Sequence, residues 1–167
     1  MGQFPAWAAG SKITSAQLTQ MEVNAAFKAS DTMRSSTTTI TADPDLQINL
    51  GVGTFLIVGY WGITGGTTGS SDMKVTIAYT GTVGFGSWTP FGPTTASSTA
   101  VYQNGGALGA TAALGTYSTT IPVNAGPQGL VTTSSSGSLQ VQWAQNTSNA
   151  TATTLKAGSW LYALQIA

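Results

Sequence analysis

Two segments near the end of the chain alternate apolar and polar residues, and this alternation constrains the fold more than any other feature. In the first, Leu139, Val141 and Trp143 alternate with two glutamines and an alanine. In the second, every other residue from Trp160 to Ile166 is large and apolar. A period of two is typical of a β-strand with one buried face. The polar loop between them has no helical pattern, so the pair predicts a β-hairpin or a crossover between sheets, with both tryptophans in the core.

Weaker strand patterns precede this pair. Residues 46–50 and 73–79 alternate in the same way, and glycines and prolines separate the segments. The stretch from Phe55 to Trp61 is almost continuously apolar, which is typical of a central strand buried on both faces. About eight to ten short strands separated by such turns favour a mainly β fold, an antiparallel β-sandwich of jelly-roll-like architecture. We assign residues 37–167 to this domain.

The N-terminal region predicts a different structure, an extended arm followed by a short α-helix from residue 14 to about residue 30. Thr14 and Gln17 have the spacing of a capping box, and Leu18 and Met21 begin a thin apolar stripe. Such a helix is marginally stable alone and must pack on its own domain, a symmetry mate or a host structure. We favour the last two and assign residues 1–36 to an anchoring segment. Its expected contact residues are Phe4, Trp7, Ile13, Leu18 and Met21.

Charged residues are unusually scarce. They make up 6% of the chain, against roughly 25% in ordinary globular proteins. The formal net charge is zero, and a net charge near zero promotes association. We therefore expect much of the surface to be covered by copies of the chain or by another protein.

Most catalytic and cofactor chemistry lacks its usual residues here. The chain has no histidine and no cysteine, the commonest general base and the thiolate ligand of metals. Asp43 and Asp45 flank a proline, which indicates a solvated turn rather than an acid–base pair. Five basic residues spread over the chain form no patch for nucleic acid, and no apolar run approaches the ~20 residues of a membrane span. We predict no enzyme activity, no cofactor and no metal.

Aromatic residues are the remaining candidates for recognition. Trp88 and Phe91 lie in a stretch rich in glycine and proline, so we expect them in an exposed loop. An exposed aromatic patch there would contact either a ligand or another subunit.

Three parts of the chain resemble small virion structural proteins of tailed phages, especially phages of actinobacteria. The first is Trp7-Ala-Ala-Gly-Ser-Lys-Ile-Thr14, followed by Leu18, and the second is the strand of residues 55–61 followed by that of residues 73–79. The third is Gly137-Ser-Leu-Gln-Val-Gln-Trp-Ala-Gln-Asn-Thr-Ser148 with Ala152-Thr-Thr-Leu-Lys-Ala-Gly-Ser-Trp-Leu161. Such proteins are described as minor structural, decoration, head-fibre or tail-appendage proteins.

The resemblance implies a β-sandwich on an N-terminal anchor, commonly a homotrimer, on the surface of the phage particle. It implies partners within the virion, the major capsid protein or another virion protein, and no enzyme. A capsid decoration or head-fibre protein is the first expectation. The alternative is a tail-fibre or receptor-binding module that recognises host surface glycans through Trp88 and Phe91.

Overall fold

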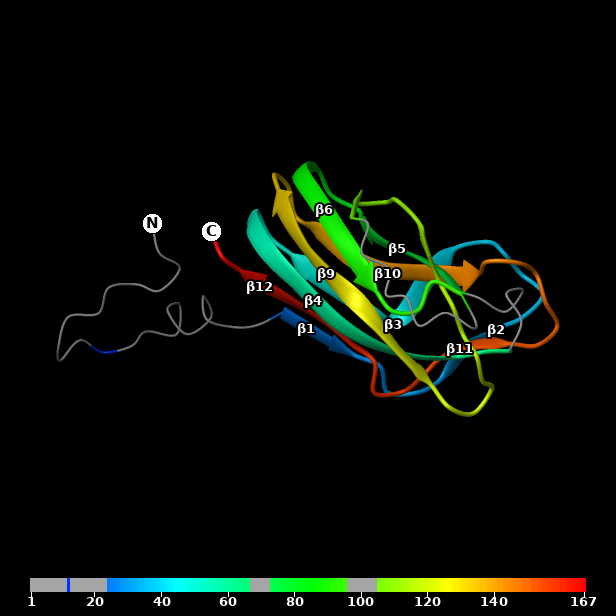
Figure 1. Cartoon of the computed structure of the whole chain (residues 1–167). Helices are drawn as coiled ribbons and strands as arrows, with labels where there is room; N and C mark the ends of the chain where they lie inside the picture. Colours follow the sequence, from blue (N-terminus) through cyan, green and yellow to red (C-terminus); the bar gives the residue numbers. More distant parts are fainter. Residues whose placement is uncertain (1–11, 13–23, 67–72, 96–104) are drawn as a thin grey trace.

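The computed structural model describes residue 12 and residues 24–66, 73–95 and 105–167. Throughout these residues the regular secondary structure is β-strand, arranged in two antiparallel sheets that pack face to face (Figure 1). The expectation of a mainly β sandwich is confirmed.

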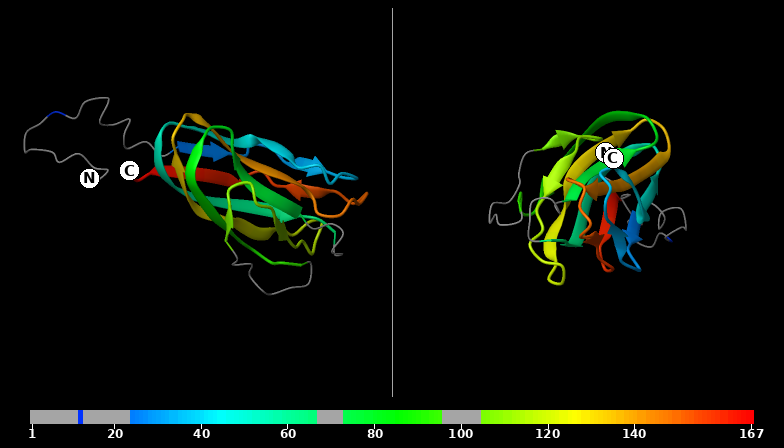
Figure 2. Two further views of the ribbon diagram at one scale, coloured as in Figure 1. Left: turned by 90° about the horizontal axis from the view of Figure 1, so that it is seen from above. Right: turned by 90° about the vertical axis from the view of Figure 1, so that its right-hand side faces the viewer.

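The large sheet has eight strands, and the small sheet has four. The large sheet runs in the order β1 (Asn24–Phe27), β12 (Trp160–Gln165), β4 (Gly53–Thr64), β9 (Val123–Thr133), β6 (Val83–Phe91) and β7 (Gly106–Ala107), with β11 (Thr153–Leu155) pairing with both β4 and β2 (Thr32–Arg34). The small sheet runs in the order β3 (Thr41–Leu50), β10 (Gly137–Gln145), β5 (Met73–Tyr79) and β8 (Ala112–Leu114). Figure 2 shows the two layers from above and from one end.

The core lies between the two sheets, and the chain crosses repeatedly from one sheet to the other. The chain passes from β3 to β4, from β4 to β5 and from β5 to β6, and each step changes sheet. The alternate residues that face inward are apolar in both layers, so the two inner faces bury each other. Ile57 and Trp61 of the large sheet and Ile77 and Trp143 of the small sheet are fully buried in this core.

The two C-terminal strands form a crossover, not a hairpin, because β10 lies in the small sheet and β12 in the large one. Trp143 is buried in the core, as predicted. The prediction for Trp160 is wrong: Leu161 and Ala163 face inward and are fully buried, and Trp160 faces outward. Both sets of alternate residues in β12 are apolar, so the period alone does not decide which set is inside.

The C-terminal part of the predicted N-terminal helix is a strand. Asn24–Phe27 forms β1, which pairs with β12 along its whole length at the edge of the large sheet. Pairing satisfies the backbone there and outweighs a weak local preference for a marginal helix. The expected contact residues Phe4, Trp7, Ile13, Leu18 and Met21 lie outside the described residues, as do residues 14–23 of that helix. β1 and β2 join the large sheet, although the predicted arm extended to residue 36.

Candidate interaction face

A buried cluster of charges, here called the ion cluster, joins the two sheets. It consists of Lys28, Asp43 and Asp45. Lys28 Nζ, just after β1, lies 2.9 and 3.0 Å from the two carboxylate oxygens of Asp43 and 3.1 Å from Asp45 Oδ2. It also donates to Thr32 Oγ1 at 2.6 Å. The side chains of Lys28 and Asp43 are completely buried, so the positive charge is neutralised where water cannot reach it.

Asp43 does not lie in a solvated turn, which corrects the expectation from sequence. The pairing of β3 with β10 shifts its register at this point, and the extra residues of β3 form a bulge. Asp43 Oδ1 accepts the backbone N–H groups of Asp45 and Leu46, at 3.1 and 3.3 Å. Oδ2 accepts the indole N–H of Trp143 at 3.1 Å. The local turn therefore exists, but it lies within strand β3, and the Asp43 carboxylate contacts the buried ammonium of Lys28.

Arg34 closes this end of the sandwich over Trp143. Its guanidinium lies 4.2 Å from the centre of the indole ring, and it donates to the backbone carbonyls of Thr41, Ala42 and Trp143. Burial lowers the pKa of this guanidinium, and the nearby Asp43 carboxylate opposes that shift. With every carboxylate oxygen of Asp43 occupied, this arrangement is suited to holding strands together and not to proton transfer.

The third ion pair lies at the surface. Lys156 Nζ contacts Asp31 Oδ2, and the backbone N–H of Ala157 donates to Asp31 Oδ1 at 2.8 Å. The hydrogen bond from Lys156, helped by that from Ala157, lowers the pKa of Asp31. Among the described residues, Lys12 and Lys74 are the charged side chains outside these contacts. Most charged side chains of the described residues thus take part in contacts within the chain.

The Asp31 pair predicts a small pH effect. Because the pKa of Asp31 is lowered on folding, its contribution to stability is present at neutral pH and is lost as the pH falls through the folded-state pKa. Asp31→Asn should therefore lower the melting temperature at pH 7 in low salt, and the two proteins should converge at acid pH. Thermal melts from pH 7 to pH 2.5 measure this. Melting curves that differ equally at every pH would contradict it.

The outer face of the large sheet over β1, β12, β4, β9 and β6, here called the aromatic face, is mostly apolar, and its members carry no charge. The surface pair of Lys156 and Asp31 lies at its end, where Lys156 follows Leu155 and lies beside Gly62 of β4. Residues paired across antiparallel strands share a face, which allows its members to be followed from the register. The apolar members are Phe27, Leu56, Val58, Tyr60, Phe85, Phe91, Leu130, Trp160, Tyr162 and Leu164, and Thr54, Ser87, Thr89, Gln128 and Thr132 lie among them. Phe27 and Phe85 have 59% and 55% of their surface exposed.

An aromatic row crosses this face from edge to edge. Phe27 of β1 pairs with Trp160, and Trp160 pairs with Tyr60. The register of β4 with β9 sets Gly126 opposite Tyr60, and Gly126 pairs with Phe91. A Cβ at Gly126 would lie 2.1 Å from the backbone oxygen of Gly59 and 2.9 Å from the Phe91 ring, so glycine leaves room for both the β4 backbone and that ring.

The rings at the β1 side of the row contact one another. The centres of the Trp160 and Tyr162 rings are 4.7 Å apart with 32° between their planes. Phe27 meets Tyr162 edge to face at 5.5 Å, and Tyr60 stacks on Trp160 at 6.4 Å. The hydroxyl of Tyr60 donates to Asn124 Oδ1 at 2.8 Å. These contacts hold the side chains in place although they lie at the surface.

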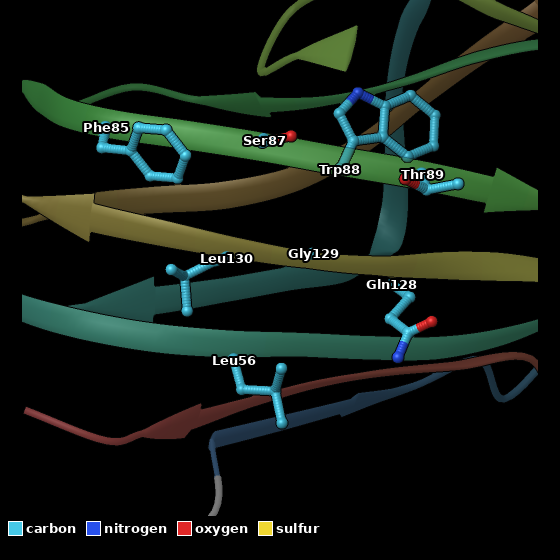
Figure 3. Close-up of a pocket in the computed structure, with 8 residues that line it drawn as sticks. All are labelled: Leu56, Phe85, Ser87, Trp88, Thr89, Gln128, Gly129 and Leu130. Atoms are coloured by element: carbon cyan, nitrogen blue, oxygen red, sulfur yellow. The ribbon is translucent and has the colours of Figure 1, made fainter. Parts of the chain in front are cut away.

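A shallow depression of about 370 Å³ lies beside the row, over β9 (Figure 3). Leu56, Phe85 and Leu130 project around it from three neighbouring strands, and its polar members are Ser87, Thr89 and Gln128. It contains no titratable side chain and is wide open, so it lacks the convergent polar groups that hold a small molecule.

The structure separates the two aromatic residues singled out in the sequence. Trp88 lies in strand β6 and is buried in the core with 2% of its surface exposed, so its expected position in an exposed loop is wrong. Phe91 ends the same strand and is exposed on the aromatic face. Because residues alternate along a strand, two aromatics three positions apart face opposite sides.

The other members of the aromatic face were missed because their strands are apolar on both sides. Tyr60 belongs to the run predicted to be buried on both faces, and Trp160 was assigned to the core. The sequence did contain a signal for this face, because these strands have no polar side. A sandwich covers only one side of each sheet, so the second apolar side must lie at the surface.

Other kinds of site find little support in the described part of the chain. It contains no group of three or more acidic residues, histidines or cysteines that could hold a metal ion. It also contains no helix with the length and hydropathy that a membrane span requires. No protein-family model matches the sequence, and no curated protein matches it.

Proposed function

We propose that the protein is a structural component of a phage virion, a capsid decoration or head-fibre protein that is anchored by its N-terminal segment and exposes its β-sandwich. The observation that supports a role as a subunit of an assembly is the distribution of charge. The ion cluster lies inside the domain, and the aromatic face is left without a single charge. Such a surface suits a subunit that works inside an assembly.

The placement of the carboxylates supports a role without catalysis. Asp43 is buried against Lys28 and Trp143, and Asp31 is paired with Lys156. General acid–base catalysis requires a group that can reach a substrate and exchange its proton. Asp43, which is completely buried, does not have that freedom. The virion assignment itself rests on the sequence resemblance, which also supplies the expected homotrimer and the partners, the major capsid protein or another virion protein.

Localisation in purified particles tests the proposal. Electron microscopy of virions, with an antibody against the β-domain, should show density at symmetry axes of the capsid. Label found only at the tail tip would favour the tail-fibre or receptor-binding alternative. Absence of the protein from purified particles would refute the virion assignment altogether.

Removing residues 1–23 should separate folding from attachment. The truncation stops before β1, so the pairing with β12 and the ion cluster are retained. We expect the melting temperature to stay within a few degrees of the full chain and binding to particles that lack the protein to be lost. Co-sedimentation with such particles measures the binding. Normal attachment of the truncated protein would contradict the anchoring role.

A truncation of residues 1–30 is the matched comparison. It removes β1 and Lys28, and it leaves the Asp43 carboxylate buried without its cation. This second truncation should be strongly destabilised, so loss of attachment by it alone would say nothing about anchoring.

The glycan-recognition alternative loses one of its two expected contact residues. Trp88 is buried and cannot stack on a sugar. The rings of Trp160 and Tyr162 turn toward each other, at 4.7 Å between centres, and so do not offer two open faces. Phe91 remains available on the surface, but no specific polar cluster accompanies it among the described residues.

A further inference from the structure

We infer that the aromatic face is a self-association surface that binds the same kind of face on a second copy of this chain. The inference deepens the proposed function, on which it rests for its biological meaning, by naming the partner of this surface. It is nevertheless a property of the purified protein and can be tested without the virion.

The first argument comes from the residues themselves. In β4 the inward Phe55 and Ile57 are fully buried, and the outward Leu56 and Val58 between them are equally apolar. In β12 the inward Leu161 alternates with outward aromatics. Strands that are apolar on both sides are typical of sheets covered on both faces. Within the described residues only the inner side of these strands is covered by the second sheet.

The second argument is area. The face spans five strands, and at ~4.8 Å between strands and ~3.3 Å per residue it measures roughly 24 Å by 20 Å, on the order of 500 Å² in projection. Its accessible area is larger because side chains project from it. Monomers rarely expose an apolar patch larger than a few hundred Å², and a stable protein–protein interface buries ~800 Å² on each partner. The face is thus at the upper end of the range for a free surface, and it can supply a large part of the area that a stable interface buries.

The third argument is charge. The members of the aromatic face are uncharged, so a second copy can pack over them without stripping water from a charged group. The exposed pair of Lys156 and Asp31 lies at the end of the face, outside its members. Depletion of charge and enrichment of aromatic residues are the compositional marks of the buried centre of a subunit interface. The polar members, such as Ser87 and Gln128, are uncharged and can pair with one another.

The fourth argument is shape. The depression bounded by Leu56 and Leu130 lies next to Phe85, whose ring projects from the same face. A surface that contains both a projection and a hollow can pack against copies of itself, in a dimer or around a threefold axis. Pairing through sheet edges is less suitable. The edge strands β1 and β7 have four and two residues, and the bulge with Pro44 interrupts β3.

Analytical ultracentrifugation of the full chain tests the inference. The parent should sediment as a dimer or trimer of the 16.9 kDa chain at micromolar concentration. Phe85→Lys places a charge on the aromatic face and should weaken self-association roughly 100-fold or more, because an unpaired charge would be buried. Ile121→Lys is the matched control, because Ile121 is exposed to a similar extent, 60%, in the loop between β8 and β9. It should assemble like the parent.

Single cysteine variants give an independent measurement, since the chain has no other cysteine. A nitroxide label at Phe91→Cys should show a dipolar distance to its copy that is shorter than the distance for a label at Ile121→Cys. A monomeric parent, or a Phe85→Lys variant that assembles normally, would overturn the inference. A monomer that binds host polysaccharide through Phe91 would overturn it as well.

The outcomes for the two proposals can be told apart. A self-associating protein that is absent from virions would refute the proposed function and leave the self-association surface standing. A monomeric protein that is found on virions would refute the surface and leave the function standing.

Discussion

Lys28→Met is expected to lower the free energy of unfolding by about 3–5 kcal/mol, because it leaves a buried carboxylate without its cation. Asp43 is completely buried and faces Lys28 at 2.9 Å. Methionine preserves most of the volume of the lysine side chain, so the loss reports on charge more than on packing. For a chain of this size the melting temperature should fall by roughly 6–20 °C. Chemical denaturation and calorimetry measure both quantities.

Lys156→Met is the matched control for this prediction. Lys156 also pairs with an aspartate, but both side chains are more than one third exposed. Pairs at such positions contribute ~0–1 kcal/mol, so this variant should unfold close to the parent. Adding Asp43→Asn to Lys28→Met should recover part of the loss, since the amide removes the unpaired charge. Equal effects of Lys28→Met and Lys156→Met would show that the ion cluster has no special role.

Trp143→Ala is the second large effect, with an expected loss of about 3–5 kcal/mol from the cavity alone. The indole is fully buried between the sheets, donates to Asp43 at 3.1 Å and supports the guanidinium of Arg34. The full loss should therefore reach the top of that range. Urea denaturation followed by circular dichroism is suitable, because it does not depend on the removed fluorophore.

Trp143→Phe separates packing from hydrogen bonding. It keeps a ring in the core but removes the N–H that Asp43 accepts, which should cost about 1–3 kcal/mol. A Trp143→Ala variant that unfolded like the parent would place this residue outside the energetic core. Because Lys28 and Trp143 share Asp43, the losses from Lys28→Met and Trp143→Ala should not add, and a double-mutant cycle should show a coupling of about 0.5–3 kcal/mol.

The sequence was informative wherever a strand has one apolar side. The segments at Leu139–Trp143 and Met73–Tyr79 alternate clearly, and both are strands whose buried side was assigned correctly. The assignment failed for Trp160, where apolar residues occupy both sides of the strand. Hydrophobic period specifies register only when one face is polar, so the feature that obscured the orientation of β12 is the same one that marks the aromatic face.

Two further differences have long-range causes. Asp43 and Asp45 flank a proline, a local pattern that indicates a solvated turn, and nothing nearby reveals Lys28 fifteen positions earlier or Trp143 a hundred positions later. Asn24–Phe27 is likewise a strand because β12, from the other end of the chain, pairs with it. Local propensity cannot anticipate either partner, since both contacts form only when the sandwich closes.

The pairing of the first and last strands has a mechanical consequence. A force directed along β1 would act parallel to the strand and at right angles to its hydrogen bonds with β12. Those bonds then resist in shear as a group, instead of opening one after another. Lys28 follows the last residue of β1 and is held by the ion cluster. It would therefore oppose sliding of β1 along β12. The domain is therefore expected to resist tension along β1 better than tension across it.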